Sequence, residues 1–221
     1  MTSLAARYEA LKASLPKGVE LIAVSKTRSV DEIKALYDLG HRAFGENYPQ
    51  ELKDKQAQLP ADVQWHFIGH LQTNKVKYIA PFVHLVHSGD SERLLDELDK
   101  RAAANNRTIS VLLQVHVAQE ETKFGFTLEE LEPLVPGFRD RWTNLRIEGL
   151  MAMASLTEDM EQVQRELAGV NALFDRIKAS GAFPIGQFAT LSMGMSSDLP
   201  VALANGSNMV RIGTALFGAR P

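Results

Sequence analysis

The sequence predicts an α/β protein that forms a single (β/α)8 barrel of the TIM type, spanning residues 1–221, with an extra helix at its N-terminus. Short apolar segments typical of buried strands alternate eight times with amphipathic helical segments, and the connections between them are short. No Gly/Ser-rich linker or change in composition divides the chain, and 221 residues with 45% hydrophobic content can build one full-sized core. We therefore expect one closed parallel sheet surrounded by helices.

An open, doubly wound sheet is the competing architecture. Such a sheet usually carries a glycine-rich turn after its first strand, where it binds a dinucleotide. Here the corresponding turn, residues 25–30, reads SKTRSV and contains no glycine. This difference favours the closed barrel.

The expected elements follow from hydrophobic periodicity and from the residues that end helices. The opening helix, residues 4–15, carries apolar side chains at three- and four-residue spacing and ends at Pro16. The expected strands are residues 19–26, 41–47, 63–69, 83–90, 109–118, 145–154, 189–194 and 209–218. The helices expected between them are residues 30–39, 48–58, 73–80, 91–106, 128–142, 161–179 and 200–206, of which 128–142 is interrupted by Pro133 and Pro136.

Composition and charge argue against several functional classes. The 24 basic residues nearly balance 27 acidic ones, and a net charge of −3 gives no reason to expect a nucleic-acid partner. The absence of cysteine excludes a disulfide scaffold, a thiol nucleophile and a thiolate metal site. The six histidines fall on separate segments without a metal-binding helix motif, so we expect no metal.

The first segment of the chain is charged. Arg7, Glu9 and Lys12 occupy positions where a signal peptide needs an unbroken apolar run. No segment approaches 18 apolar residues without interruption. We therefore expect a cytoplasmic protein without a membrane partner.

Lys26 is the first candidate for chemistry. It follows the apolar run 21–24, and thus lies at the carboxyl end of the first strand, where barrels place their active sites. A lysine amine can attack a carbonyl and form a Schiff base if burial or nearby cations depress its pKa. A lysine that only snorkels or forms a salt bridge is the alternative at this position.

Polar and small residues also follow the later strands. Asn47 ends the second strand, His66 lies in the third, His87 lies near the end of the fourth, and Lys123 follows the fifth. The last two strands end in LSMGMS, with Ser192 and Gly194, and in RIGT, with Gly213 and Thr214. Small residues let main-chain N–H groups approach an anion, hydroxyls add donors, and barrels often bind phosphate after strands seven and eight. Together with Lys26, these loops suggest a ligand with an aldehyde at one end and a phosphate at the other, which pyridoxal 5'-phosphate (PLP) provides.

Arg211 lies two residues before Gly213 and shares its face of the last strand. We interpret it as the partner of the pyridine nitrogen of PLP. An arginine there keeps the ring unprotonated and weakens it as an electron sink. A salt bridge between Arg211 and a carboxylate such as Glu148 is the alternative.

Five segments carry a resemblance to a known family, and they are spread over most of the chain, from residue 23 to residue 218. They are AVSKTRSVDEIKALYDLGHRAFGENYPQE, WHFIGHLQTNK, LLQVHVAQEETKFGF, IEGLMAMA and LSMGMSSDLPVALANGSNMVRIGTALFG. With these motifs the chain resembles the pyridoxal phosphate homeostasis proteins, also known as YggS/PROSC-type PLP-binding proteins. The resemblance implies a fold-type-III PLP barrel, similar to that of alanine racemase but without that enzyme's second, β-rich domain.

The resemblance also implies roles for individual residues. Lys26 is the implied Schiff-base lysine, Asn47 lies beside the cofactor, and Arg211 faces the ring nitrogen. Ser192, Gly213 and Thr214 are the implied phosphate ligands, with Gly194 in the same loop as Ser192. Members of the family are taken to bind, buffer or deliver PLP rather than to turn over a substrate, so apo PLP-dependent enzymes are candidate recipients, and we expect a monomer.

Two other functions stay open at this point. One is a PLP-dependent amino-acid racemase-like enzyme, although racemisation needs acid/base groups on both faces of the cofactor and a barrel without a second domain has no obvious opposite base. The other is a PLP-free Schiff-base lyase that acts on a phosphorylated sugar through the same lysine and phosphate loops.

Overall fold

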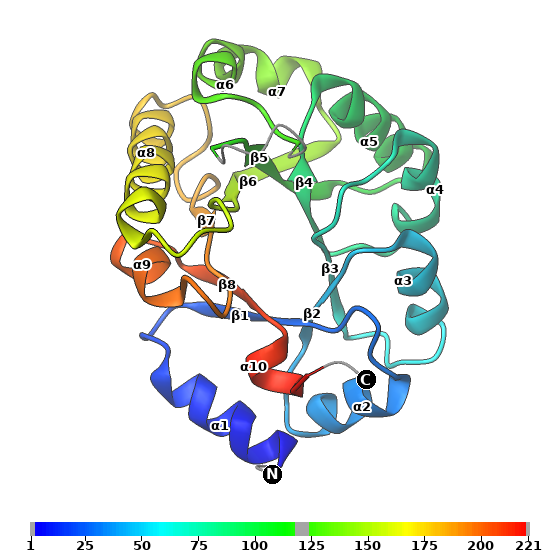
Figure 1. Ribbon diagram of the computed structural model, residues 1–221. Helices are drawn as coiled ribbons and strands as arrows, with labels where there is room; N and C mark the ends of the chain where they lie inside the picture. The colour runs from blue at the N-terminus through cyan, green and yellow to red at the C-terminus, as the bar shows by residue number, and fades with distance from the viewer. Residues whose placement is uncertain (1–2, 118–123, 220–221) are drawn as a thin grey trace.

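Eight parallel strands close into a barrel in the computed structural model, which describes residues 3–117 and 124–219 (Figure 1). The strands are β1 (Glu20–Val24), β2 (Ala43–Glu46), β3 (Gln64–Phe67), β4 (Leu85–Gly89), β5 (Ile109–Val115), β6 (Leu145–Ala152), β7 (Thr190–Ser192) and β8 (Met209–Ile212). They follow one another around the barrel in chain order. Closure occurs at β1, where Ala23 lies opposite Phe44 of β2 and Ile212 of β8. The prediction of a closed (β/α)8 barrel is confirmed.

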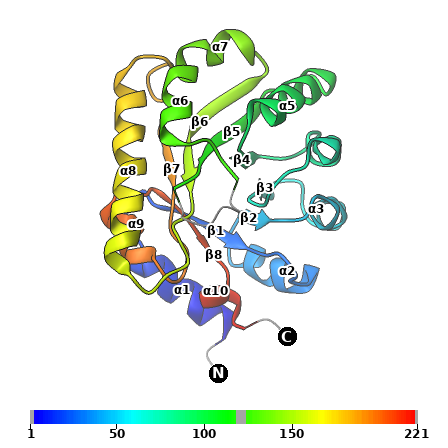
Figure 2. The same cartoon turned by 45° about the horizontal axis from the view of Figure 1, so that its top comes forward.

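Helices surround the barrel on the outside (Figure 2). They are α1 (Leu4–Ser14), α2 (Val30–Asp38), α3 (Pro49–Gln56), η1 (Thr73–Lys75), α4 (Val76–Ile79), α5 (Glu92–Ala104), α6 (Leu128–Leu134), η2 (Val135–Gly137), α7 (Phe138–Arg141), α8 (Met160–Ala179), α9 (Leu199–Ala204) and α10 (Thr214–Phe217). The expected extra N-terminal helix is α1, which precedes β1. None of the helices in the described part of the chain is long and apolar enough to cross a membrane.

The core has two layers, because alternate side chains of a strand point to opposite faces of the sheet. The larger layer packs between the strands and the helices. The smaller layer fills the inside of the barrel and consists of Ile22, Ala43, Leu85, Leu112, Met151 and Met209, with Met153 packed against it. Two residues further along β4 and β8, toward their carboxyl ends, the interior becomes polar with His87 and Arg211.

The structure corrects the expected strand over residues 209–218. The strand β8 ends at Ile212, and the short helix α10 begins at Thr214. The main-chain N–H groups of Leu216 and Phe217 both donate to the carbonyl of Gly213. Both side chains are buried, and a short buried helix has the same apolar sequence as a buried strand, so periodicity alone did not separate the two.

Two expected helices are divided. Residues 128–142 form α6, η2 and α7, and residues 73–80 form η1 and α4. Pro136 lies at the start of η2 and has no N–H to continue the hydrogen bonds of α6, so the helix tightens there into a 3-10 turn.

The helix α1 is tied to α10. The guanidinium of Arg7 donates from Nε to the carbonyl of Leu216 at 2.7 Å and from Nη2 to that of Phe217 at 3.2 Å. In Figure 1 the two helices lie next to each other beside the ends of β1 and β8. The N-terminal helix therefore helps to hold the segment that follows the last strand.

Candidate functional site

Lys26 lies two residues beyond the end of β1, and its side chain is half-buried. The preceding residue, Ser25, is fully buried. The following residue, Thr27, has a φ of 64°, in the left-handed region that residues other than glycine rarely adopt. The chain then enters α2 through a capping box between Ser29 and Glu32. Lys26 therefore stands in a tight, ordered turn at the barrel mouth.

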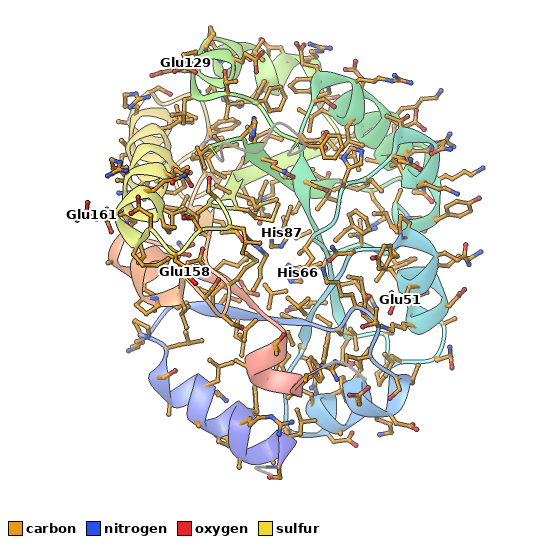
Figure 3. The ribbon with its side chains drawn as sticks, viewed as in Figure 1. Glu51, His66, His87, Glu129, Glu158 and Glu161 are labelled. Carbon is orange, nitrogen blue, oxygen red and sulfur yellow. The ribbon has the colours of Figure 1, made fainter. Side chains whose placement is uncertain are left out.

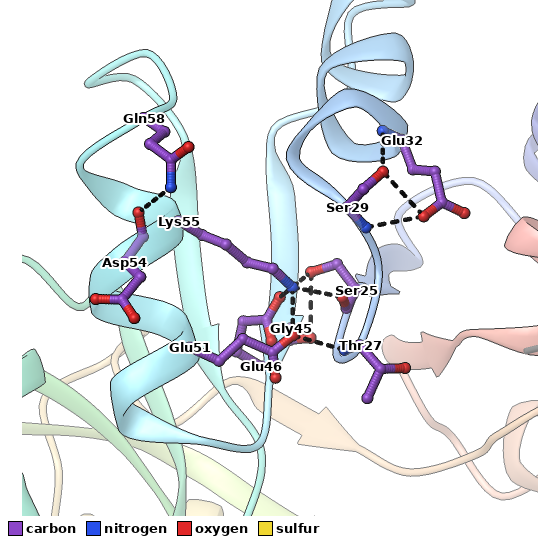
Figure 4. Close-up of polar contacts among 10 residues, drawn as sticks. All are labelled: Ser25, Thr27, Ser29, Glu32, Gly45, Glu46, Glu51, Asp54, Lys55 and Gln58. Atoms are coloured by element: carbon purple, nitrogen blue, oxygen red, sulfur yellow. Dashed lines mark hydrogen bonds and ion pairs between the residues drawn. The ribbon is translucent and has the colours of Figure 1, made fainter. Parts of the chain in front are cut away.

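A cluster of four residues lies under this turn, and we call Ser25, Glu46, Glu51 and Lys55 the Lys55 cluster (Figure 4). Three of the four are buried, and Glu51 is partly exposed. The Nζ of Lys55 donates to the carbonyl of Ser25 at 2.8 Å, to Oε1 of Glu46 at 2.8 Å and to Oε1 of Glu51 at 2.7 Å. The hydroxyl of Ser25 also donates to Oε1 of Glu46, at 2.6 Å. Burial raises the pKa of Glu46, and the charge of Lys55 opposes this shift.

Sequence reasoning did not identify the Lys55 cluster. The only local signal is the four-residue spacing of Glu51 and Lys55, which allows an ion pair on any helix. The burial of Glu46 and Lys55 depends on how α3 packs against β2, and the sequence does not show this packing. Lys55 is a second lysine near the mouth, but its three donor positions are already occupied.

Asn47 directly follows β2 and lies at the same end of the barrel as Lys26. Its Oδ1 atom is buried, and the described residues provide no hydrogen-bond partner for it. Buried polar atoms nearly always have a partner in a protein or in ordered water. The carbonyl of Asn47 is thus an acceptor that a ligand or a water molecule can satisfy.

Arg211 is buried inside the barrel, where it is held by three hydrogen bonds. Its Nη1 donates to the carbonyl and the hydroxyl of Ser192, at 2.8 and 2.6 Å, and its Nη2 donates to the carbonyl of Ala152 at 3.0 Å. Burial lowers the pKa of Arg211 to about 10, and Asp198 opposes the shift. Arg211 therefore keeps its charge at neutral pH, and within residues 3–117 and 124–219 its Nε–H has no acceptor.

The alternative of a salt bridge between Arg211 and Glu148 is wrong. Glu148 instead pairs with Nε of Arg146 at 3.2 Å and accepts a hydrogen bond from the hydroxyl of Ser110 at 2.6 Å. Arg211 lies further toward the carboxyl ends of the strands, in the polar part of the interior.

Two histidines extend the hydrogen bonds of Arg211 across the barrel. Figure 3 shows His66 and His87 pointing into the space enclosed by the strands. Nδ1 of His87 is 3.2 Å from the hydroxyl of Ser192, and Nε2 of His87 is 3.0 Å from Nδ1 of His66. Burial lowers the pKa of His66 to about 3 and that of His87 well below its usual value, so both rings are neutral at physiological pH.

We call the hydrogen-bonded row of Arg211, Ser192, His87 and His66 the histidine relay. Arg211 is the starting point for assigning which group donates in each of its hydrogen bonds. Arginine only donates, so the Ser192 hydroxyl accepts from Arg211; we assign its own proton to Nδ1 of His87, because the described residues offer that proton no other acceptor. His87 must then carry its proton on Nε2 and donate it to His66. His66 is left with its proton on Nε2, which has no acceptor among the described residues.

The hydroxyl of Ser192 thus has a partner on each side and is fully buried. A phosphate contact from this residue would have to come from its main chain or replace one of these partners. The role of Ser192 as a phosphate ligand stays a prediction. Its observed contacts place it between Arg211 and His87.

The loops after β7 and β8 lie close to the end of β1. The main-chain N–H of Arg211 donates to the carbonyl of Gly194 at 3.1 Å, which joins the loop after β7 to the strand β8. At Gly213 an added Cβ would come within 3.3 Å of the Cβ of Val24, so the glycine allows the last loop to approach β1 two residues before Lys26. Thr214 is exposed at the start of α10. The structure thus brings Lys26, Gly194, Gly213 and Thr214 to one end of the barrel.

Lys123, the residue of interest after the fifth strand, lies outside the described residues. A search of the described residues for three or more histidine, aspartate or glutamate side chains that could hold a metal ion finds no such group.

Comparisons with known proteins agree on one family. The whole chain, residues 1–221, matches the family model for the N-terminal domain of alanine racemase. A pyridoxal phosphate homeostasis protein from Pasteurella multocida is 38% identical over 205 residues, which are 91% of this chain and 87% of that protein. The protein of the same name from Aquifex aeolicus is 41% identical over 202 residues, with coverage of 91% and 87%.

Solved structures give the same result. PipY of Synechococcus elongatus PCC7942 without PLP superposes with a TM-score of 0.92 at 35% identity, covering 98% of this chain and 100% of PipY. The structure of PipY with PLP bound gives a TM-score of 0.87 at 34% identity and the same coverage. Alanine racemase from Bartonella henselae gives 0.71 at 19% identity and covers 99% of this chain but 60% of the racemase, a likeness of fold alone.

Proposed function

The chain belongs to the pyridoxal phosphate homeostasis protein family, and on this premise we propose that it binds PLP and holds it as a Schiff base on Lys26 for intracellular PLP homeostasis. One observation carries the proposal. A lysine at the end of β1 and a buried arginine on the neighbouring strand β8 share one end of the barrel, and the arginine has a donor left for a ligand.

The residues present suit PLP in three ways. Arg211 directs a charged guanidinium into the barrel with its Nε–H available, which suits an unprotonated pyridine nitrogen. Asn47 offers a buried side-chain carbonyl that has no partner among the described residues. Gly213, Thr214 and Gly194 follow β8 and β7, where barrels commonly bind phosphate, and we propose them as phosphate ligands together with Ser192.

The same residues argue for binding rather than turnover. PLP supplies an electron sink to bound amines, and a carboxylate partner at the ring nitrogen strengthens that sink. Here the partner is Arg211, which keeps its own proton at neutral pH because its pKa is about 10. The imidazoles of His66 and His87 are buried and uncharged, and each is committed to the histidine relay. Arg211 would therefore hold the ligand, and neither histidine would exchange a proton with it.

We also propose that bound PLP passes to apo forms of PLP-dependent enzymes, and that the protein acts as a monomer in the cytoplasm. A half-buried Lys26 is consistent with transfer, because a recipient can approach a ligand that is not sealed inside the barrel. Tyr48, on the rim beside Asn47, is 55% exposed and would be a contact for such a recipient.

Reduction of the PLP complex with borohydride tests the proposal. We expect purified wild-type protein incubated with PLP to show a visible absorption band and, after reduction, to gain the mass of one PLP less one oxygen atom, because condensation releases water and borohydride adds two hydrogens. Lys26→Ala should show neither change. Lys34→Ala removes an exposed lysine on α2 that pairs with Asp38, and it should behave as wild type.

Three outcomes would contradict the proposal. Wild-type protein that gains no band and no mass does not hold PLP as a Schiff base. Reductive trapping of a phosphorylated sugar in place of PLP would support the lyase. Exchange of the α-proton of amino acids by wild type, above the level of Lys26→Ala, would support a racemase-like enzyme.

A further inference from the structure

The main chain is held on both sides of Lys26 by one set of connected side chains, of which Glu46 and Lys55 are buried and Glu51 is partly exposed. On the N-terminal side, Nζ of Lys55 donates to the carbonyl of Ser25, and the Ser25 hydroxyl donates to Glu46. On the C-terminal side, the N–H of Thr27 donates to Oε1 of Glu51 at 2.6 Å. Figure 4 shows these contacts meeting at Lys55.

Thr27 is the residue whose main-chain conformation depends most on these contacts. Its φ of 64° is unfavourable for a β-branched residue, since the side chain crowds the main chain in the left-handed region. Strained residues of this kind persist where surrounding contacts hold them, and they gather at functional sites. The hydrogen bond from Thr27 to Glu51 is such a contact, and it lies one residue from Lys26.

Lys55 joins the two sides. Its ammonium group bonds to Ser25, Glu46 and Glu51 at 2.7 to 2.8 Å, so all three of its donors are in use. The ammonium is buried, and a buried charge needs such compensation. A lysine held in this way is unsuited to attack an aldehyde. The position of Lys55 in the cluster instead suits a structural role.

We propose that Glu51 and Lys55 are positioning residues for Lys26, which they aim at the aldehyde of PLP by fixing the main chain of Ser25 and Thr27. The inference rests on the proposed function. In the step concerned, the neutral amine of Lys26 bonds to the aldehyde carbon, and its two hydrogens leave with the aldehyde oxygen as one water molecule. The rate of this step depends on the approach of Nζ to the carbon, and small displacements slow it strongly.

The test separates formation of the Schiff base from binding. Pyridoxine 5'-phosphate is an alcohol with the ring and phosphate of PLP, so it binds without reacting with Lys26. For Glu51→Ala we expect the rate of Schiff-base formation with PLP to fall about tenfold or more. The dissociation constant for pyridoxine 5'-phosphate should stay unchanged, which also shows that the site is folded.

A conservative variant and a matched control sharpen the test. Glu51→Gln keeps an oxygen that accepts from Thr27, so it should form the Schiff base close to the wild-type rate. Glu97→Ala removes the carboxylate of another four-residue pair, with Arg101 on α5, and should leave both readouts unchanged.

The outcomes distinguish the two proposals. If wild-type protein forms no Schiff base, the proposed function fails. If wild type forms it and Glu51→Ala forms it equally fast, the positioning role is overturned while PLP binding stands. An equal defect in Glu51→Ala and Glu51→Gln would also overturn the role, because acceptance of the Thr27 N–H would then not be what matters.

Discussion

Two buried serines on the barrel strands show how differently one residue type can be used. Ser192 has its hydroxyl between Arg211 and His87 and accepts from one and donates to the other. Ser88 on β4 is equally buried, but its Oγ has no partner among the described residues. Burial of the hydroxyl therefore stabilises the fold at Ser192 and destabilises it at Ser88.

We predict that Ser192→Ala lowers the free energy of unfolding by about 1 to 3 kcal/mol, because Nδ1 of His87 loses its partner inside the protein. Ser88→Ala should be neutral or slightly stabilising, since it removes a buried hydroxyl that makes no hydrogen bond to any residue the structure describes. Urea denaturation of both variants measures the two values. Equal destabilisation by the two substitutions would show that Ser192 is not held by the histidine relay.

At the scale of elements, a bulge in β6 arranges the site. Opposite β5, Ile147 pairs with Val111 and Gly149 pairs with Leu112, so Glu148 is an extra residue in β6. Because of this insertion, Ile147 and Leu150 both pack in the layer between strands and helices, and Met151 faces the barrel interior. The bulge thus sets the register of the segment whose Ala152 carbonyl accepts from Arg211.

Gly149 is required at this bulge. Its φ is 154°, and a Cβ there would overlap the main chain of Thr190 on β7. We predict that Gly149→Ala lowers the free energy of unfolding by about 4 kcal/mol or more, which is in the range of severe substitutions. Gly137, with a φ of −88° and open space around it, is the control, and Gly137→Ala should be neutral or stabilise by up to about 1 kcal/mol. If urea denaturation showed that Gly149→Ala lowers the free energy of unfolding only slightly, the bulge would not be a fixed feature of the fold.

At the scale of the whole molecule, the fold keeps histidines neutral in its interior. Burial lowers the pKa of His66 from 6.5 to about 3 and lowers that of His87 well below 6.5. Between these pH values the unfolded chain binds protons that the folded chain does not. The free energy of unfolding therefore rises with pH in this range, by up to about 1.4 kcal/mol per pH unit for each such histidine. Below about pH 6.5 the fold should lose stability as acid is added.

Two carboxylates act in the opposite direction. Burial raises the pKa of Glu46, and desolvation together with the charge of Glu148 raises that of Glu20, so above pH 4.5 the folded chain keeps protons that the unfolded chain has released. Their contribution to stability is lost as pH rises through their raised pKa. The two carboxylates are present in wild type and in a variant at one histidine alike. The difference in free energy of unfolding between these two proteins therefore removes the contribution of the carboxylates.

We predict that His66→Gln shows a weaker pH dependence of stability than wild type. Glutamine can accept the hydrogen bond from His87 but does not titrate. The free energy of unfolding of wild type minus that of the variant should increase between pH 4.5 and 6.5 by up to about 1.4 kcal/mol per pH unit. Urea denaturation across this range measures the difference, and Ser88→Ala should parallel wild type. A parallel profile for His66→Gln would show that His66 is protonated in the folded protein.

The sequence by itself determined the barrel, the order of its strands and the place of Lys26. These follow from local rules, because hydrophobic periodicity identifies strands and helices, and the carboxyl ends of parallel strands meet at one edge. The same rule brought Asn47, Arg211 and the loops with Gly194 and Gly213 to that end. The roles of these residues at a cofactor stay predictions.

Only the tertiary structure decided which side chains meet inside the barrel. Arg211 bonds to Ser192 and Ala152 rather than to Glu148, His87 joins His66 to Ser192, and Lys55 is buried under Lys26. The bulge at Gly149 and the helix α10 also left no pattern in the sequence. The partners in these contacts lie 19 to 105 residues apart in the chain. They meet because the sheet closes on itself, and closure depends on the packing of the whole molecule rather than on any local segment.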